Sequence, residues 1–276
     1  RLLGDTTSTG ITAAIASTGT LTSPTATGAN VDFVYVRNNV IKGGYFGIAL
    51  SGNSLPDFDN NVVIENNQLL KQYYYGMRLY LMANVLVKGN TVKGLRNTFN
   101  YGVYTFYTRN MDVESNNIMA GTYGLYLYYP NYNVLTAPAT NNTIANNMAT
   151  GATYPSYFYS PRYLNIYHNT FKGGTYGYYS AAATTAGQDL RELNIKNNIF
   201  AGSTNAFYQV AIYPAANNVT LDYNAYSSTG TNLAYYGANQ ANLAAWQTSA
   251  ATLNTNSVAG NVLFVASDDL HILGAF

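Results

Sequence analysis

The chain has 276 residues, of which only 9% are charged, and its formal net charge is +1. Such a composition offers no basic patch for nucleic acid or for an anionic membrane surface. No apolar stretch approaches the roughly 20 residues of a membrane span. The chain contains no cysteine, which excludes disulfides and thiolate metal sites. A large repeat protein has core enough without disulfides, so an extracellular or cell-surface location is compatible with this composition.

Residues 1–33 are rich in Thr, Ala, Ser and Gly. We expect them to form an N-terminal cap or a degenerate coil of the repeat that follows. They lack the basic segment and apolar core of a signal peptide. We therefore expect the chain to be a mature or excised part of a longer polypeptide.

From residue 34 a short pattern, apolar-x-apolar-x-x-Asn-x-apolar, recurs eight times at intervals of 22 to 31 residues. The copies are VYVRNNVI (34–41), VVIENNQL (62–69), VLVKGNTV (85–92), MDVESNNI (111–118), NTIANNMA (142–149), LNIYHNTF (164–171), LNIKNNIF (193–200) and VTLDYNAY (219–226). A period in the twenties with variable spacing is typical of a solenoid whose coils carry loops of different length. We therefore predict an all-β solenoid with about eight recognisable coils over residues 34–237.

The aligned asparagine of each copy falls at a turn between two strands. These residues are Asn39, Asn67, Asn90, Asn116, Asn147, Asn169, Asn198 and Asn224. The residue three positions earlier is apolar in every copy, which predicts a strand with that side inside the tube. Because Asn tolerates left-handed backbone and its amide both donates and accepts, we predict a buried asparagine ladder along the tube.

The residue two positions before each asparagine should face outward, and its charge alternates. The column reads Arg37, Glu65, Lys88, Glu114, Ala145, Tyr167, Lys196 and Asp222. Stacked coils would place opposite charges about 4.8 Å apart, so we expect this column to pair and to help fix the register. Glu65 and Glu114 are therefore poor candidates for catalytic acids.

An aromatic-Gly-apolar motif follows most copies, as in FGI (46–48), YGM (75–77), YGV (101–103), YGL (123–125) and YGY (176–178). Its glycine is expected to mark a bend into a further strand. Alternation beyond the motif predicts two outward columns. The first is Ala49, Arg78, Tyr104, Tyr126, Tyr159, Tyr179 and Tyr208, and the second is Ser51, Tyr80, Phe106, Tyr128, Pro161, Ala181 and Val210. Neither column contains an acid. The two columns therefore predict an aromatic wall without the carboxyl pair of a glycoside hydrolase.

The last segment, 238–276, reads as a closing piece: a helix around LAAWQ (243–247), then NVLFV (261–265) and SDDLHI (267–272). Together with the Asn-rich repeat it resembles the right-handed parallel β-helix, or pectin-lyase-like, superfamily, and secreted bacterial cell-surface members in particular. In those proteins a short Trp-containing helix precedes a "PLF" strand and a "DLHL" motif; here Val262 stands where Pro is usual. The resemblance implies one β-helix domain over residues 1–276. It implies no activity, because the superfamily contains lyases, hydrolases, phage tailspikes and adhesins.

Few residues are candidates for catalysis. Arg78 is the one cation on the tyrosine strand, and Asp57 and Asp59 lie in the loop before it. Such a trio could serve a polysaccharide lyase, with calcium held by the carboxylates. The favoured interpretation is a solvated loop and an arginine lying over its aromatic neighbour.

The two histidines have simpler explanations than catalysis. His168 could act as a base, but it occupies a position that is Asn in four other copies, which favours a polar turn residue. His271, with Asp268 and Asp269, belongs to the closing piece, where we expect it to cap the end rather than to hold a metal. No cofactor is therefore predicted.

The sequence thus favours a non-catalytic extracellular module of a larger cell-surface or filament protein. Its binding surface would be the tyrosine strand, facing a glycan or neighbouring copies of the chain. The residues expected on that surface are Arg78, Tyr80, Tyr104, Phe106, Tyr126, Tyr128, Tyr159, Tyr179 and Tyr208. Two alternatives stay open: a polysaccharide lyase or glycoside hydrolase acting on an anionic polysaccharide, and a mechanical spacer in a giant adhesin.

Overall fold

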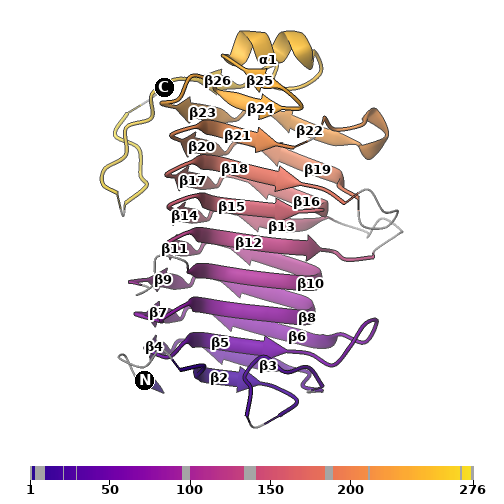
Figure 1. Ribbon diagram of the computed structural model, residues 1–276, viewed down its shortest axis with the longest axis vertical. Coiled ribbons are helices and arrows are strands. Elements are labelled where there is room, and N and C mark those ends of the chain that lie inside the picture. Colours follow the sequence, from indigo (N-terminus) through magenta and orange to yellow (C-terminus); the bar gives the residue numbers. More distant parts are fainter. Residues whose placement is uncertain are drawn as a thin grey trace.

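Parallel strands stack coil upon coil along the length of the molecule, as the computed structural model in Figure 1 shows. The structure describes residues 2–3, 10–20, 22–28, 30–94, 100–133, 141–183, 189–210, 212–267 and 269–274. Neighbouring coils pair in parallel throughout the repeat, and apolar side chains from all coils form one continuous core. The predicted all-β solenoid is confirmed.

The strands of the described residues form two sheets. A 10-stranded sheet contains β1 (Leu2–Leu3), β4 (Val40–Lys42), β7 (Gln68–Leu70), β9 (Thr91–Lys93), β11 (Asn117–Met119), β14 (Met148–Gly151), β17 (Thr170–Gly173), β20 (Ile199–Gly202), β23 (Ala225–Ser228) and β26 (Val258–Ala259). The second sheet has 16 strands and bends around a corner of the tube, because β8 (Tyr75–Lys88) and β10 (Tyr101–Glu114) each run through both of its walls.

The two walls of the second sheet carry different parts of the repeat. One wall contains β3 (Val34–Arg37), β6 (Asp59–Glu65), β13 (Asn142–Ala145), β16 (Arg162–Tyr167), β19 (Arg191–Lys196) and β22 (Val219–Asp222). The other contains β2 (Ala13–Ser17), β5 (Phe46–Ser51), β12 (Tyr123–Pro130), β15 (Tyr154–Tyr159), β18 (Tyr176–Ala181), β21 (Asn205–Gln209), β24 (Ala234–Tyr236) and β25 (Asn239–Gln240). This second wall faces the viewer in Figure 1, and the aromatic-Gly-apolar motifs lie at the start of strands that run through it.

The asparagine ladder is confirmed, and it links every coil of the repeat to the next. In the middle of it, the backbone N–H of Asn116 donates to Oδ1 of Asn147 at 3.0 Å, and Nδ2 of Asn147 donates to the carbonyl of Val113 at 2.8 Å. The same pattern runs from Asn39 to Asn224. At the last rung the backbone N–H of Asn224 donates to Oγ of Ser257.

We expected the ladder asparagine to take the left-handed backbone of the turn. The structure gives this backbone to the residue just before it. These residues are Asn38, Asn66, Gly89, Ser115, Asn146, His168, Asn197 and Tyr223, all with φ between 54° and 64°. The turn therefore needs left-handed backbone at one position, while the next position needs a buried amide.

The outward charge column stacks in the predicted register, but its pairs are only partly formed. Nε of Arg37 lies 3.3 Å from Oε2 of Glu65, and Nζ of Lys88 lies 3.1 Å from Oε2 of Glu114. Asp222 is the register partner of Lys196, yet its carboxylate accepts from the backbone and side chain of Asn256 instead. Each exposed pair contributes at most about 1 kcal/mol, so the column adds little stability.

The two ends of the solenoid are built differently. At the start, β1 and β2 pair in parallel with β4 and β5, so these residues continue the coil. At the other end the short helix α1 (Leu243–Ser249) lies across the last coil (Figure 1). Trp246 is completely buried beneath it against Phe207 and Tyr226. The expected Trp-containing closing helix is thus confirmed.

Candidate functional site

The most extensive feature of the surface is an aromatic face on the wall formed by β5, β8, β10, β12, β15, β18, β21 and β24. Its side chains form three columns along the tube, which together we call the tyrosine face. The first column is Phe46, Tyr75, Tyr101, Tyr123, Tyr154 and Tyr176; the second is Arg78, Tyr104, Tyr126, Tyr157, Tyr179, Tyr208 and Tyr235; the third is Tyr80, Phe106, Tyr128 and Tyr159. Apart from the fully buried Phe46, these side chains are partly exposed.

Tyr159 belongs to the third column and not to the second, where the sequence placed it. Tyr126 is the register partner of Tyr157, and Tyr128 is the register partner of Tyr159. Pro161 consequently lies outside the face. The coil has Pro155 in place of the motif glycine, so the alternation had no marker from which to count.

The first column was not predicted as part of the surface. Strict alternation from the inward Val103 would turn Gly102 outward and Tyr101 inward, whereas Gly102 is buried and Tyr101 is partly exposed. A Cβ on Gly102 would lie 2.2 Å from Cγ2 of Ile118 in the neighbouring sheet. The glycine therefore allows two walls to approach closely at the corner, and the change of direction there shifts the alternation.

Within each column the rings cover one another's faces. In the second column Tyr126 and Tyr157 stack at a centroid distance of 4.4 Å with 8° between their planes, and the column continues in the same way to Tyr235. Rings of the first column meet those of the second edge to face, as Tyr123 meets Tyr126 at 89°. Rings in the middle of the face are therefore covered on their faces by neighbouring rings, whereas a sugar stacking on an aromatic ring needs an open ring face.

The face is uncharged over most of its length. Burial raises the pKa of Tyr104 and Tyr126, and neighbouring phenols raise that of Tyr126 further, so these hydroxyls stay protonated at neutral pH. Arg78 is the single cation within the three columns. Its guanidinium lies over the ring of Tyr80 at 5.2 Å and donates to Oγ of Ser51, and burial lowers its pKa. Arg78 thus lies over its aromatic neighbour, which is the interpretation that the sequence favoured over a catalytic role.

The structure does not join Arg78 to the acids suggested as its catalytic partners. Among the described residues it forms no ion pair with Asp57 or Asp59. Asp59 is buried, accepts from the backbone N–H of Val31, and has a pKa raised by that burial and by neighbouring acids. The lyase hypothesis therefore has no assembled constellation within the described part of the chain.

Both histidines occupy structural positions. His168 has left-handed backbone at the turn between β16 and β17, with φ of 54°. Nδ1 of His271 lies 2.5 Å from the carboxylate of Asp269 in a short hairpin, where Phe264 pairs with Ile272. Asp268, the third residue of the expected end cap, lies outside the described residues.

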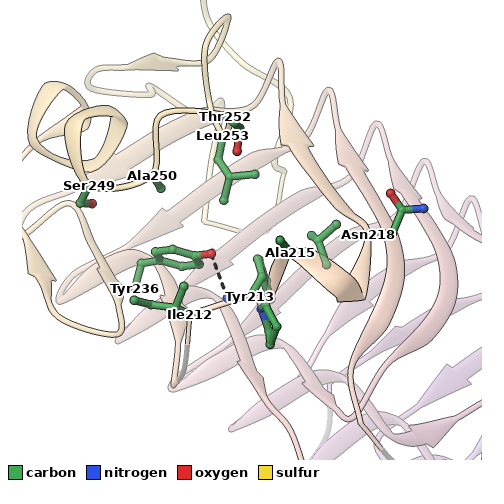
Figure 2. A pocket seen from close by; sticks show the side chains of 11 residues that line it. Ile212, Tyr213, Ala215, Asn218, Tyr236, Ser249, Ala250, Thr252 and Leu253 are labelled. Carbon is green, nitrogen blue, oxygen red and sulfur yellow. Dashed lines mark hydrogen bonds between the residues drawn. The ribbon is translucent and has the colours of Figure 1, made fainter.

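Two hollows lie on either side of the segment from Ile212 to Pro214, near the end of the solenoid. The first, of about 340 Å³, is drawn in Figure 2, where the hydroxyl of Tyr236 accepts from the backbone N–H of Tyr213 beside Leu253. The second, of about 310 Å³, is lined by Asp189, Leu190 and Gln209 among other residues. Sequence reasoning found neither, because loops of irregular length form their walls.

A family model described as periplasmic copper-binding protein (NosD) matches residues 8–187, which is more than half of the chain. No curated protein and no solved structure matches this chain. In the part of the chain that the structure describes, no helix is both long and apolar enough to cross a membrane. The family match covers the coils from β2 to β18.

Proposed function

Because the chain belongs to the NosD family, a group within the parallel β-helix superfamily that its repeat resembles, we propose that it acts outside the cytoplasm as a non-catalytic β-helix module. In this proposal the tyrosine face is its binding surface, and the first partner is a second copy of the same chain. The module would belong to a larger periplasmic or cell-surface assembly. The observation that carries the proposal is the uncharged, three-column aromatic face.

The shape and charge of the face favour association with a similar surface. Solitary soluble domains rarely expose an apolar patch that spans many strands, and tyrosine is enriched in protein interfaces. Most rings, such as Tyr126, show edges rather than open faces, which disfavours sugars that stack on aromatic rings. The formal net charge of +1 opposes contact between two copies only weakly.

The donor set of this chain does not fit a copper site of the kind suggested by the family's description. Copper prefers thiolate, thioether and imidazole ligands. The chain has no cysteine, and its two histidines lie at a turn and in the terminal hairpin described above. The described residues contain no group of three His, Cys, Asp or Glu that could hold a metal ion.

The methionines do not supply the missing ligands. Met77, Met82 and Met111 are buried in the core. Met119 and Met148 lie on neighbouring strands, but their register partners are Thr150 and Asn117. We therefore route no part of the proposed function through copper.

Sedimentation velocity of the purified chain over a range of concentrations tests the proposal. The informative variant is Tyr126→Arg with Tyr157→Arg, because Arg78 shows that this column accepts a guanidinium, which lies there over the ring of Tyr80. Two charges would have to be desolvated on association, so we expect the variant to stay monomeric where the native chain associates. The control is Tyr35→Arg with Tyr223→Arg, which changes tyrosines that are 56% and 54% exposed outside the three columns.

Equal association of native chain and face variant would contradict the proposal. A native chain that is monomeric at every concentration but binds an insoluble polysaccharide through Tyr126 and Tyr157 would replace self-association with glycan adhesion. Loss of association in the control pair as well would indicate a general charge effect rather than a specific face.

A further inference from the structure

The terminal hairpin borders a further hollow, on the 10-stranded sheet and away from the tyrosine face. After β26 the chain runs back beside β20 and β17 (Figure 1). A hollow of about 400 Å³ lies between residues 261–264 and these two strands. Lys172 is the one charged side chain among the described residues that line this space, which we call the Lys172 hollow.

The ammonium of Lys172 has no counter-charge in the described part of the chain. Its Nζ lies 4.8 Å from the ring centroid of Phe264, a cation–π contact that keeps the charge beside the hollow. It forms no ion pair with a described residue, whereas Lys88 pairs with Glu114. Lys172 is partly exposed and also lines a neighbouring hollow of about 330 Å³, again without a described acid. An accessible cation of this kind favours an anionic ligand.

Uncharged polar groups surround the cation. Asn261 is exposed, and its carboxamide makes no hydrogen bond with the described residues. The exposed hydroxyl of Ser203 donates to the carbonyl of Gly174, and that of Thr229 donates to the carbonyl of Ser203 at 3.4 Å. Both hydroxyl oxygens can therefore still accept hydrogen bonds. The hollow thus offers donors to a carboxylate and acceptors to hydroxyl groups.

The size of the hollow and its remaining walls fit a molecule about as large as a sugar unit. The apolar side chains of residues 262–263 suit its C–H groups, and about 400 Å³ is near the low end of the range for small-ligand pockets. We propose that the Lys172 hollow binds a polyhydroxylated carboxylate, either an open-chain sugar acid or a cyclic one. Lys172 and the amide of Asn261 bind the carboxylate, while Ser203 and Thr229 accept from the hydroxyls.

Ligand-observed NMR titrations of the full chain test this with four probes. Gluconate and glucuronate carry both a carboxylate and hydroxyls, glucose carries only hydroxyls, and acetate carries only a carboxylate. We expect millimolar binding of gluconate or glucuronate. Glucose and acetate should bind at least about tenfold more weakly, because each lacks one of the two sets of contacts. The acid that binds more tightly identifies an open-chain or a cyclic ligand.

Three variants alter the charge complementarity of the hollow in different ways. Lys172→Gln should weaken binding of the acid at least about tenfold, whereas Lys172→Arg should retain it, because the guanidinium keeps both the charge and the cation–π contact. Asn261→Asp leaves Lys172 in place but adds a carboxylate beside the ligand, so it should weaken binding of the acid and leave binding of glucose unchanged. Lys93→Gln is the matched control, because Lys93 is exposed at the same repeat position three coils earlier, on β9.

Equal binding of the acids, glucose and acetate by the native chain, or no binding of either acid, would overturn the proposal. Unchanged binding in Lys172→Gln, or a loss in Lys93→Gln as large as that in Lys172→Gln, would overturn it as well. Melting temperatures of all four variants should match that of the native chain, which separates lost binding from lost folding. None of these readouts depends on self-association through the tyrosine face.

Discussion

Replacing Asn147 by Ala would remove one complete rung from the middle of the asparagine ladder. Oδ1 of Asn147 accepts from the backbone N–H of Asn116 at 3.0 Å and from its Nδ2 at 2.9 Å. Nδ2 of Asn147 donates to the carbonyl of Val113 at 2.8 Å and to Oδ1 of Asn169 at 2.9 Å. Asn147 is completely buried, so water cannot replace these bonds.

The cost follows from the groups left without a partner. The variant leaves the buried N–H of Asn116 without an acceptor and removes a donor from the carbonyl of Val113, each at about 1–3 kcal/mol. The missing side chain also leaves a small cavity. We therefore expect the free energy of unfolding to fall by about 4 kcal/mol, a large part of the ~5–15 kcal/mol typical of a domain.

Asn39→Ala is the comparison within the same ladder. Asn39 is only half-buried at the end of the ladder, and its Nδ2 donates to the carbonyl of Arg37 and to Oδ1 of Asn67. Water can replace these bonds, so the variant should cost about 1 kcal/mol or less.

Urea unfolding followed by far-ultraviolet circular dichroism measures both variants, and the fluorescence of the single tryptophan reports the closing helix separately. Asn147→Asp adds a test of charge. It keeps the acceptor but buries a carboxylate whose pKa burial must raise, so its stability should be highest at low pH and fall as the pH rises. Equal losses for Asn147→Ala and Asn39→Ala would refute the ladder as a main source of stability.

Three further variants or measurements test other parts of the structure. Gly102→Ala should cost about 2–3 kcal/mol in urea unfolding, because its Cβ would lie 2.2 Å from Ile118, whereas Gly274→Ala, with no atom within 4 Å, should cost nothing measurable. Burial raises the pKa of Asp59, so the contribution of Asp59 to stability falls as the pH rises from the ordinary pKa of the carboxyl to its raised pKa. Asp59→Asn should remove this pH-dependent loss of stability. Melting temperatures with the same pH profile for the native chain and the variant would contradict this expectation. Burial raises the pKa of Tyr154 to about 12 and raises the pKa values of other tyrosines of the face, such as Tyr126 and Tyr157. Phenolate absorbance should therefore show most of these tyrosines still protonated near pH 11, where free tyrosine (pKa ~10) is ionised. Ionisation of nearly all tyrosines below pH 11 without unfolding would be inconsistent with the stacked columns.

The sequence predicted the solenoid and the ladder because both depend on one short pattern that repeats in every coil. It misplaced Tyr159, because Pro155 replaces the glycine from which the alternation was counted. It missed the first column of the tyrosine face, because the corner at Gly102 changes which side of the strand faces out. The two hollows beside residues 212–214 gave no signal, because loops of irregular length form much of their walls.

Mass-spectrometric footprinting with a tyrosine-modifying reagent at rising protein concentration tests whether the tyrosine face is an association surface. We expect modification of face residues such as Tyr126 and Tyr157 to decline as the chain associates. Modification of Tyr35 and Tyr223, outside the face, should stay constant. Constant modification of the face, or an equal decline at all of these tyrosines, would show that the chain does not associate through the tyrosine face.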